Sequence, residues 1–191
     1  MPCPVPGEGQ VRIRTAACGI CATDLAMIAG HERAPAGTIL GHEWSGLVDA
    51  VGPGVDASWL GRRCVAENVL AGGGEVGFEH PGGYAEYFLT EAAKLQALPN
   101  DFPFALATLI EPLAVCFRGL HRLGNRQPDR ALVLGDGPVG LLMLALLHGS
   151  GCEVTLVGGR SRRLALAARL GAAACVDYHR LRGDLGQALE P

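Results

Sequence analysis

Two short segments near the start of the chain carry side chains that can bind a transition metal. The first holds the pair Cys18 and Cys21, and the second holds His42 and Glu43, which follow a glycine. A thiolate, an imidazole and a carboxylate are ligands that Zn²⁺ takes in tetrahedral sites. The spacing leaves other interpretations open, because the cysteines could form a redox pair or half of a structural zinc site, and a lone Cys and His could belong to the core. The sequence has no second Cys-x-x-Cys that would complete a four-cysteine site.

A glycine-rich segment in the second half of the chain predicts a nucleotide site. The apolar run 130–134, directly before this segment, predicts a buried strand. Residues 139–148, which overlap the end of the segment, predict a helix. In that setting the turn leaves backbone N–H groups and the positive end of a helix facing a pyrophosphate. The alternative is a glycine-rich turn that binds no ligand. The expected cofactor-binding residues, which fit G-x-G-x-x-G, are Gly135, Asp136, Gly137, Pro138, Val139 and Gly140.

The end of the next predicted strand bears on the choice of cofactor. Dinucleotide-binding folds usually place an acid there, which binds the ribose 2′-hydroxyl of NAD. Here Gly158, Gly159 and Arg160 occupy that position, and Arg162 and Arg163 follow. A carboxylate would repel a 2′-phosphate, whereas Arg160 could pair with one. We therefore expect Gly159 and Arg160 to bind the cofactor and NADP to be favoured over NAD. The alternative is that these arginines only begin a solvated helix.

The elements that must position these residues change in character near residue 100. Before it, short apolar or alternating stretches are broken by Gly and Pro, as in β-rich modules; they are residues 10–14, 46–51, 63–66 and 84–89. Residues 104–123 then predict one helix, closed by Gly124. Strands at 130–134, 153–157 and 173–176 alternate with helices at 139–148 and 161–170, the second with Ser161 as N-cap and Gly171 after its end. This order predicts a parallel α/β sheet.

Composition excludes several classes of protein. The 191 residues are 49% hydrophobic and 18% charged, which excludes a disordered chain, a coiled coil and collagen. The net charge of −3 and the scattered basic residues predict neither a nucleic-acid partner nor a membrane anchor. The seven cysteines, an odd number, and a start unlike a secretory signal predict reduced thiols and a cytoplasmic location. The longest apolar run, 141–147, is far shorter than the roughly 20 residues of a membrane-spanning helix.

Seven segments of the chain, taken in order, match the sequence pattern of one known family. They are residues 6–11, 19–24, 40–52, 61–65, 82–87, 111–115 and 135–140. In this order they resemble the zinc-dependent medium-chain alcohol dehydrogenase family, including its threonine and polyol dehydrogenases. The resemblance covers nearly the whole chain. It implies an α/β plus β protein, with a GroES-like β domain over residues 1–100, a connecting helix over 101–124, and a partial Rossmann domain, a doubly wound parallel sheet, over 125–191.

The resemblance also implies a metal site. Cys21, not Cys18, corresponds to the thiolate of the catalytic zinc, and His42 to the imidazole ligand. Glu43 is then a neighbouring carboxylate that can also bind the metal, and Glu111 matches a carboxylate that many polyol-type members place at or beside it. We expect one zinc ion per chain, with the choice between Glu43 and Glu111 left open.

Two further residues acquire roles through the same resemblance. Asp24 is expected to accept the second ring N–H of His42, which would fix its tautomer. Thr23 is expected to relay the hydroxyl proton while zinc polarises the substrate oxygen and hydride passes to the nicotinamide. Cys21, Thr23, His42 and Glu43 are therefore the expected catalytic residues.

Three departures from the family pattern limit what is expected. Residues 66–81 contain no cysteine, so the structural zinc of many relatives should be missing. Ala26 stands where many relatives have a relay histidine, and His31 receives no role, so Thr23 would pass the proton to the cofactor ribose or to water. Finally, the sequence is shorter than those of relatives. Either it is a fragment, or another chain, such as a second copy, covers an open sheet edge.

The leading interpretation is a zinc-dependent, NAD(P)-linked oxidoreductase of the EC 1.1.1 type, acting on an alcohol, polyol or amino alcohol. One alternative is a zinc-independent quinone or enone reductase on the same fold, although such proteins normally lack the Cys21, His42 and Glu43 set. A second alternative is a truncated chain that keeps the fold and does not turn over. The activity of these 191 residues alone is left open.

Overall fold

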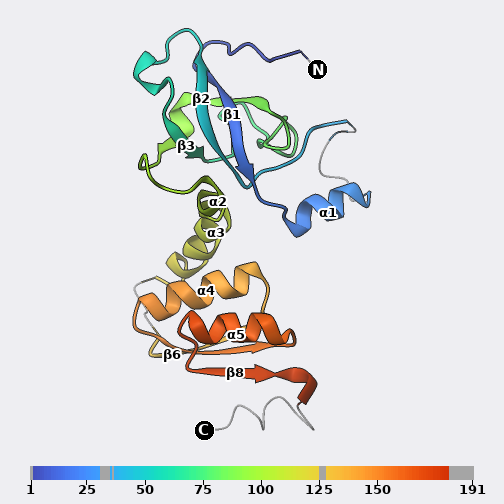
Figure 1. The fold of residues 1–191 in the computed structure, drawn as a ribbon, viewed down its shortest axis with the longest axis vertical. Helices are drawn as coiled ribbons and strands as arrows, with labels where there is room; N and C mark the ends of the chain where they lie inside the picture. The colour runs from blue at the N-terminus through green and yellow to red at the C-terminus, as the bar shows by residue number, and fades with distance from the viewer. Residues whose placement is uncertain (1, 31–34, 36, 125–127, 181–191) are drawn as a thin grey trace. The chain divides into compact units, whose positions relative to one another are not determined.

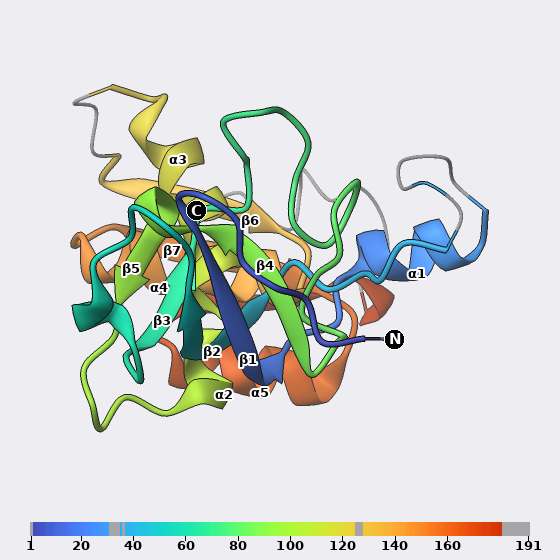
Figure 2. The ribbon, with the colours of Figure 1, turned by 90° about the horizontal axis from the view of Figure 1, so that it is seen from above.

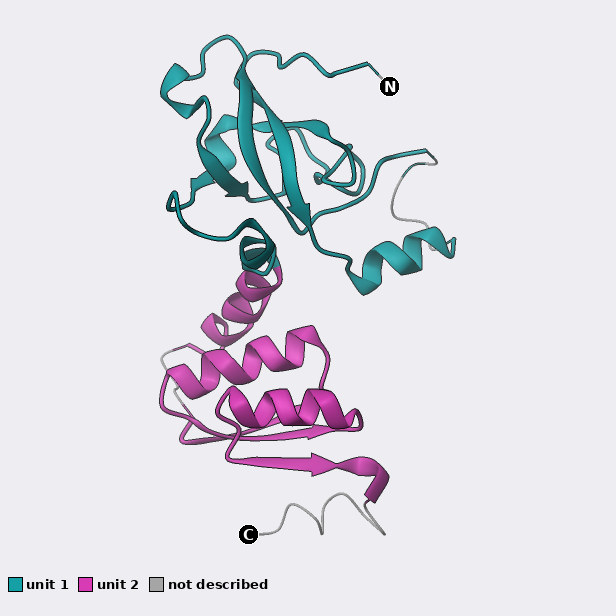
Figure 3. Ribbon diagram, in the orientation of Figure 1, with its two compact units in different colours: residues 1–111 teal, residues 112–191 magenta. Residues whose placement is uncertain are grey.

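The computed structural model describes residues 2–30, 35, 37–124 and 128–180. The chain forms two compact units, residues 1–111 and 112–191 (Figure 3). The domain boundaries expected at residues 100 and 125 stay predictions. His31 lies outside the described residues.

The first unit is built on an antiparallel sheet of five strands (Figure 1). Its order is β4-β1-β2-β3-β5, so the first two strands of the sequence pair with each other at the centre. Along β1, Val11 and Ile13 are buried while Arg12 and Arg14 are not, which is the alternation of a strand with one face on the core. The strands are β1 Gln10–Cys18, β2 Trp44–Val51, β3 Arg63–Ala66, β4 Tyr87–Glu91 and β5 Leu95–Ala97.

Apolar side chains from several strands close the core of this unit. Trp44 packs edge-on against Phe88, with ring centroids 4.8 Å apart. Cys18 lies at the margin of this core. The buried members are Val11, Ile13, Trp44, Val48, Cys64, Val76, Phe88 and Leu95.

Short helical elements connect these strands. They are α1 Ala22–Ile28 and the 3₁₀ turns η1 Ala57–Trp59 and η2 Ala92–Lys94. In both Figure 1 and Figure 2, α1 stands clear of the sheet. Helix α1 was not predicted from the sequence. In the structure Cys21 lies at the start of this helix, as its N-cap.

The helix predicted over residues 104–123 is wrong as a single element. The structure has two helices, α2 Phe104–Ala107 and α3 Ile110–His121. Pro112 lacks an N–H and is compatible only with the first turn of a helix, so a new helix begins just before it. By length and mean hydropathy, 1.3, residues Phe104–His121 could cross a membrane. That is weak support for a membrane span, because α2 packs on β1 and β2, and α3 carries the charged residues Glu111 and Arg118.

The second unit has the predicted β-α-β-α-β order. Its sheet is parallel, in the order β6-β7-β8, and α4 and α5 lie on the same face of it (Figure 1). Val133, Leu144, Leu156 and Ala167 form part of the core beneath the helices. The elements are β6 Arg130–Leu134, α4 Pro138–Gly149, β7 Glu153–Gly158, α5 Ser161–Arg169, β8 Ala174–Asp177 and the 3₁₀ turn η3 Tyr178–Arg180.

The two ends of α5 and the exposed face of β6 bear on the predictions for this unit. Arg160, not Ser161, is the N-cap of α5, and its side chain makes no capping hydrogen bond, so that prediction was wrong by one residue. Gly171 follows the helix with a φ of 99°, as its predicted position requires. On the face of the sheet away from the helices, Leu132 and Leu134 of β6 are 45% and 67% exposed.

Candidate metal centre and dinucleotide turn

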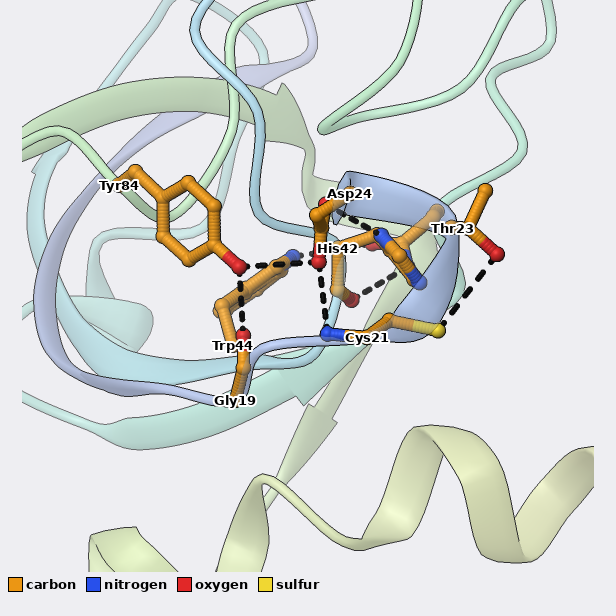
Figure 4. Close-up of polar contacts among 8 residues, drawn as sticks. Gly19, Cys21, Thr23, Asp24, His42, Trp44 and Tyr84 are labelled. Carbon is orange, nitrogen blue, oxygen red and sulfur yellow. Dashed lines mark hydrogen bonds and ion pairs between the residues drawn. The ribbon is translucent and has the colours of Figure 1, made fainter. Parts of the chain in front are cut away.

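The start of α1 places Cys21 at the first site. Cys21 is the N-cap of the helix, and its N–H donates to Oδ2 of Asp24 at 2.8 Å. Asp24 is fully buried, so the carboxylate fixes this first turn from within the fold. Sγ of Cys21 lies 3.5 Å from Oγ1 of Thr23, which places the half-buried thiol and hydroxyl side by side (Figure 4).

The backbone of His42 is held by a buried hydrogen-bond network that runs through Asn68 to Trp44. Its carbonyl oxygen accepts from Nδ2 of Asn68 at 2.7 Å, and Oδ1 of Asn68 accepts from Nε1 of Trp44 at 2.9 Å. The imidazole packs against Phe78, with ring centroids 4.5 Å apart. The side chain is only 5% exposed, so its orientation is set by packing.

Asp24 connects Cys21 to His42. Its Oδ1 lies 3.3 Å from Nδ1 of His42, which is an ion-pair distance, although neither atom has a hydrogen-bond partner with good alignment among the described residues. Its Oδ2 also accepts from the hydroxyl of Tyr84 at 2.9 Å, and that hydroxyl lies 3.0 Å from the carbonyl oxygen of Gly19 (Figure 4). With Nδ1 facing Asp24, the Nε2 atom of His42 remains for a metal.

The structure brings together three of the four expected metal ligands. One ligand atom from each of Cys21, His42 and Glu43 lies within 4.8 Å of the other two. The Glu43 carboxylate lies against Gly19, where a Cβ atom would come within 2.3 Å of its Oε2, so any larger residue at position 19 would displace the carboxylate. Burial raises the pKa of Glu43, while His42 opposes that change.

Glu111 lies outside this group. Its pKa is also raised, first by burial, and its charge interacts with those of His42 and Glu43, so it is near the site without joining the three ligand atoms. Cys18 is not part of the group either. Burial raises the pKa of the Cys18 thiol to about 12. None of the seven cysteines forms a disulfide.

The three ligands fit a zinc ion chemically. In a tetrahedral site with bonds of about 2.0–2.3 Å, ligand atoms lie roughly 3.5 Å apart, so small side-chain movements suffice to close the group. The buried, unaligned Nδ1 and Oδ1 atoms of His42 and Asp24 are the pair that metal binding at Nε2 would strengthen. Sequence reasoning identified the ligand types but missed Tyr84 and Asn68 as supports, and no spacing signal indicates either of them.

The glycine-rich segment of the second unit has the geometry of a dinucleotide turn. Gly135 has a φ of 113°, which an L side chain rarely adopts, and it follows β6 directly. Gly137 is the N-cap of α4, and Pro138 is its first residue. A Cβ atom on Gly140 would lie 2.1 Å from the carbonyl oxygen of Gly135, so glycine permits the close packing of helix against turn.

Asp136, one of the expected cofactor-binding residues, makes contacts that the sequence did not predict. Its Oδ2 accepts from the N–H groups of Gly159 at 3.0 Å and Arg160 at 2.7 Å, at the end of β7. These bonds, first that of Arg160, lower the pKa of Asp136. Gly159 and Arg160 therefore lie beside the glycine turn, as expected for neighbouring parallel strands. The carboxylate of Asp136, a residue of the turn, connects the two segments.

Comparison with known proteins places these features in one family. Residues 7–100 match the alcohol dehydrogenase GroES-like domain family. D-arabitol-phosphate dehydrogenase of Enterococcus avium is 30% identical over 207 residues, which cover 97% of this chain and 58% of that protein. The chain thus spans little more than half the length of this relative.

Solved structures agree with the fold over both units. A protein described as a zinc-binding dehydrogenase, from Sinorhizobium meliloti 1021 and solved with NADP, has a TM-score of 0.91 at 28% identity, covering 99% of this chain and 60% of that one. An alcohol dehydrogenase from Escherichia coli CFT073, solved with NADH, has a TM-score of 0.87 at 27% identity, covering 97% and 59%. The predicted fold class, a GroES-like antiparallel sheet followed by a partial Rossmann domain, is confirmed.

Proposed function

Because this chain belongs to the zinc-dependent medium-chain dehydrogenase family, we propose that it supplies the metal site and the dinucleotide turn of an oxidoreductase. The reaction is transfer of a hydride between the CH–OH group of an alcohol or polyol and NAD(P). The observation that carries the proposal is the approach of Cys21, His42 and Glu43 within 4.8 Å. The first relative, named for D-arabitol phosphate, supports a polyol-like substrate.

Cys21, His42 and Glu43 would hold one zinc ion. Glu111, whose charge interacts with those of His42 and Glu43, is the alternative carboxylate. When bound, zinc supplies Lewis-acid stabilisation of the substrate oxygen. Asp24 faces Nδ1 of His42 at 3.3 Å, so it holds the imidazole with Nε2 toward the ligand group. The same carboxylate accepts from the N–H of Cys21 and so holds both ligands in place.

Thr23 is suited to move the substrate proton. Its hydroxyl lies 3.5 Å from the Cys21 sulfur, within the ligand region, and can accept one proton while donating its own. The described chain has Ala26 near the start of α1 and no histidine in that helix, so we assign the next transfer to the cofactor ribose or to water. This assigns Thr23 the relay function and Cys21, His42 and Glu43 the binding function.

We also propose that residues 135–140 bind the pyrophosphate and that NADP is favoured over NAD. The backbone N–H groups at the start of α4 are open to an anion, and Arg160 at the end of β7 is 68% exposed. Solved relatives carry NADP in one case and NADH in another, so the preference rests on Arg160 and Gly159. A cytoplasmic location remains part of the proposal, in keeping with the reduced cysteines.

The test is an alcohol-dependent cofactor reduction assay on the zinc-loaded chain. A panel of polyols, polyol phosphates and secondary alcohols is incubated with NADP or NAD, and absorbance of the reduced nicotinamide is followed. Turnover that disappears in Thr23→Ala, while zinc content is unchanged, supports the assignment. Reduction of a quinone or enone by zinc-free protein would favour the zinc-independent alternative, and zinc and nucleotide binding without any turnover would favour a non-catalytic chain.

A further inference from the structure

The carboxylate of Asp136 occupies the space at the end of β7 where the sequence provides no acid. A Cβ atom on Gly158 would lie 2.6 Å from Cβ of Asp136, so the glycine makes room for this side chain. The Asp136 side chain is only 7% exposed, and Oδ2 is bound by the N–H groups of Gly159 and Arg160. The glycine turn thus provides the carboxylate that β7 lacks. Because the backbone surrounds it, this carboxylate is not free to bind a ribose hydroxyl.

Two arginines converge on the other side of the same carboxylate. Nη1 of Arg160 lies 3.4 Å from Oδ1 of Asp136, and Nη1 of Arg163 lies 3.9 Å from the same oxygen and 3.5 Å from the Asp136 carbonyl oxygen. Their side chains remain 68% and 39% exposed, so each guanidinium has N–H groups directed to solvent. Among the described residues, Arg162 forms no ion pair and no hydrogen bond through its side chain, although it lies between them in sequence.

Tyr178 closes the remaining space at this strand end. A Cβ atom on Gly159 would lie 2.4 Å from Cζ of Tyr178, so the ring covers the glycine. A side chain at position 159, where NAD-binding folds place their ribose-binding acid, would have to displace that ring, which is 53% exposed. As the chain stands, this strand end has two arginines and one shielded carboxylate.

Resting on the proposed dinucleotide-binding function, we propose that Asp136 is a positioning residue for a 2′-phosphate site formed by Arg160 and Arg163. The carboxylate holds both guanidinium groups beside the glycine turn, and their exposed N–H groups bind the adenosine 2′-phosphate. The two arginines exceed the one carboxylate by one positive charge, and the carboxylate lies beneath them, so a dianionic phosphate meets cations first. Arg163, in the first turn of α5, is thereby a second phosphate ligand beside Arg160.

The experiment measures binding of two ligands that differ only in the 2′-phosphate. Adenosine 2′,5′-bisphosphate and adenosine 5′-monophosphate are titrated into the full 191-residue chain by calorimetry, and the ratio of their dissociation constants is the readout. We expect a ratio of at least about tenfold for the unmodified chain, the size expected for a charge-assisted hydrogen bond. Arg160→Ala and Arg163→Ala should each reduce the ratio several-fold, whereas Arg162→Ala, matched in type and helix, should leave it unchanged.

Asp136→Asn tests the positioning role, because asparagine keeps the shape and removes the charge. The ratio should fall several-fold, but in an Arg160→Ala, Arg163→Ala background the same change should have no further effect on it, since there are no arginines left to hold. General damage to the turn would weaken both ligands alike and leave the ratio unchanged. A higher ratio in Asp136→Asn would show that the carboxylate opposes phosphate binding and would overturn the inference.

The failures of the inference and of the proposed function are distinguishable. Equal binding of the two ligands to the unmodified chain, or binding of neither, overturns the 2′-phosphate site even if NAD-dependent alcohol oxidation is found. Strong selection of the bisphosphate without any alcohol-dependent turnover supports the site and contradicts the catalytic proposal.

Discussion

Oδ1 of Asp24 lies 3.3 Å from Nδ1 of His42, both within the core of the first unit, so a carboxylate from α1 faces the imidazole that lies just before β2. The same side chain accepts hydrogen bonds from the N–H of Cys21 and the hydroxyl of Tyr84. One buried carboxylate thus orients two candidate metal ligands and is itself held by a residue 60 positions away.

Replacing Asp24 with Asn should weaken zinc binding by roughly 10- to 100-fold, the usual effect of removing a carboxylate behind a ligating histidine. The amide keeps the shape but no longer favours the metal-bound imidazole electrostatically. Competition with a chelator of known affinity gives the zinc dissociation constant. Asp49→Asn, which breaks the ion pair between Arg12 of β1 and Asp49 of β2, is the control. Equal losses in both variants would contradict a specific role for Asp24.

Tyr84→Phe should have a smaller effect in the same direction. The change removes the hydroxyl that lies 2.9 Å from Asp24 and 3.0 Å from the Gly19 carbonyl oxygen, and keeps the ring. We expect loss of about 1 kcal/mol in the free energy of unfolding and a few-fold weaker zinc binding. Tyr87→Phe, whose ring packs under Arg12, is the matched control and should leave zinc affinity unchanged. An unaltered zinc affinity in Tyr84→Phe would remove Tyr84 from the site.

Alkaline pH should destabilise the fold through its buried thiols. Burial raises the pKa of Cys64 to about 12, above the value of an unfolded thiol, so the fold favours the protonated form. Its stabilising contribution is fully present below the unfolded pKa and is lost as pH rises toward 12, at up to about 1.4 kcal/mol per pH unit. Urea unfolding at pH 8 to 11 should show a fall that is shallower in Cys64→Ala. The exposed Cys3→Ala should follow the unmodified chain, and an equal slope in Cys64→Ala would refute the assignment.

The exposed face of β6 should make the 191-residue polypeptide self-associate. Leu132 and Leu134 lie on the side of the sheet that α4 and α5 do not cover, and β6 is an edge strand among the described residues. Leu134→Lys should lower the apparent mass in sedimentation velocity. Val5→Lys changes an even more exposed apolar residue in the first unit and should leave the apparent mass unchanged. A monomeric unmodified polypeptide would show that this face is tolerated in water.

Local signals predicted the parts of the molecule that depend on neighbouring residues. The glycine-rich segment from Gly135 to Gly140 follows β6 and runs into the first turn of α4, as predicted, because its glycines are required by a φ of 113° and by a close approach within the segment itself. Contacts between distant residues were not predictable. Nothing in the sequence pairs Tyr84 with Asp24, or Asp136 with the N–H groups of Gly159 and Arg160 across 23 and 24 positions. Likewise, Pro112 divides a stretch whose apolar pattern alone favours one helix.

The central claim is that Cys21, His42 and Glu43 bind one zinc ion, and elemental analysis of the purified chain tests it most directly. Unmodified protein and Cys18→Ser should contain one zinc per chain, whereas Cys21→Ser should contain none, with circular dichroism showing that each variant is folded. Cys18 is the matched control because it lies three residues away, packs at the edge of the core and is outside the group of three ligand atoms. Two zinc ions per chain, or loss of zinc through Cys18→Ser alone, would contradict the account.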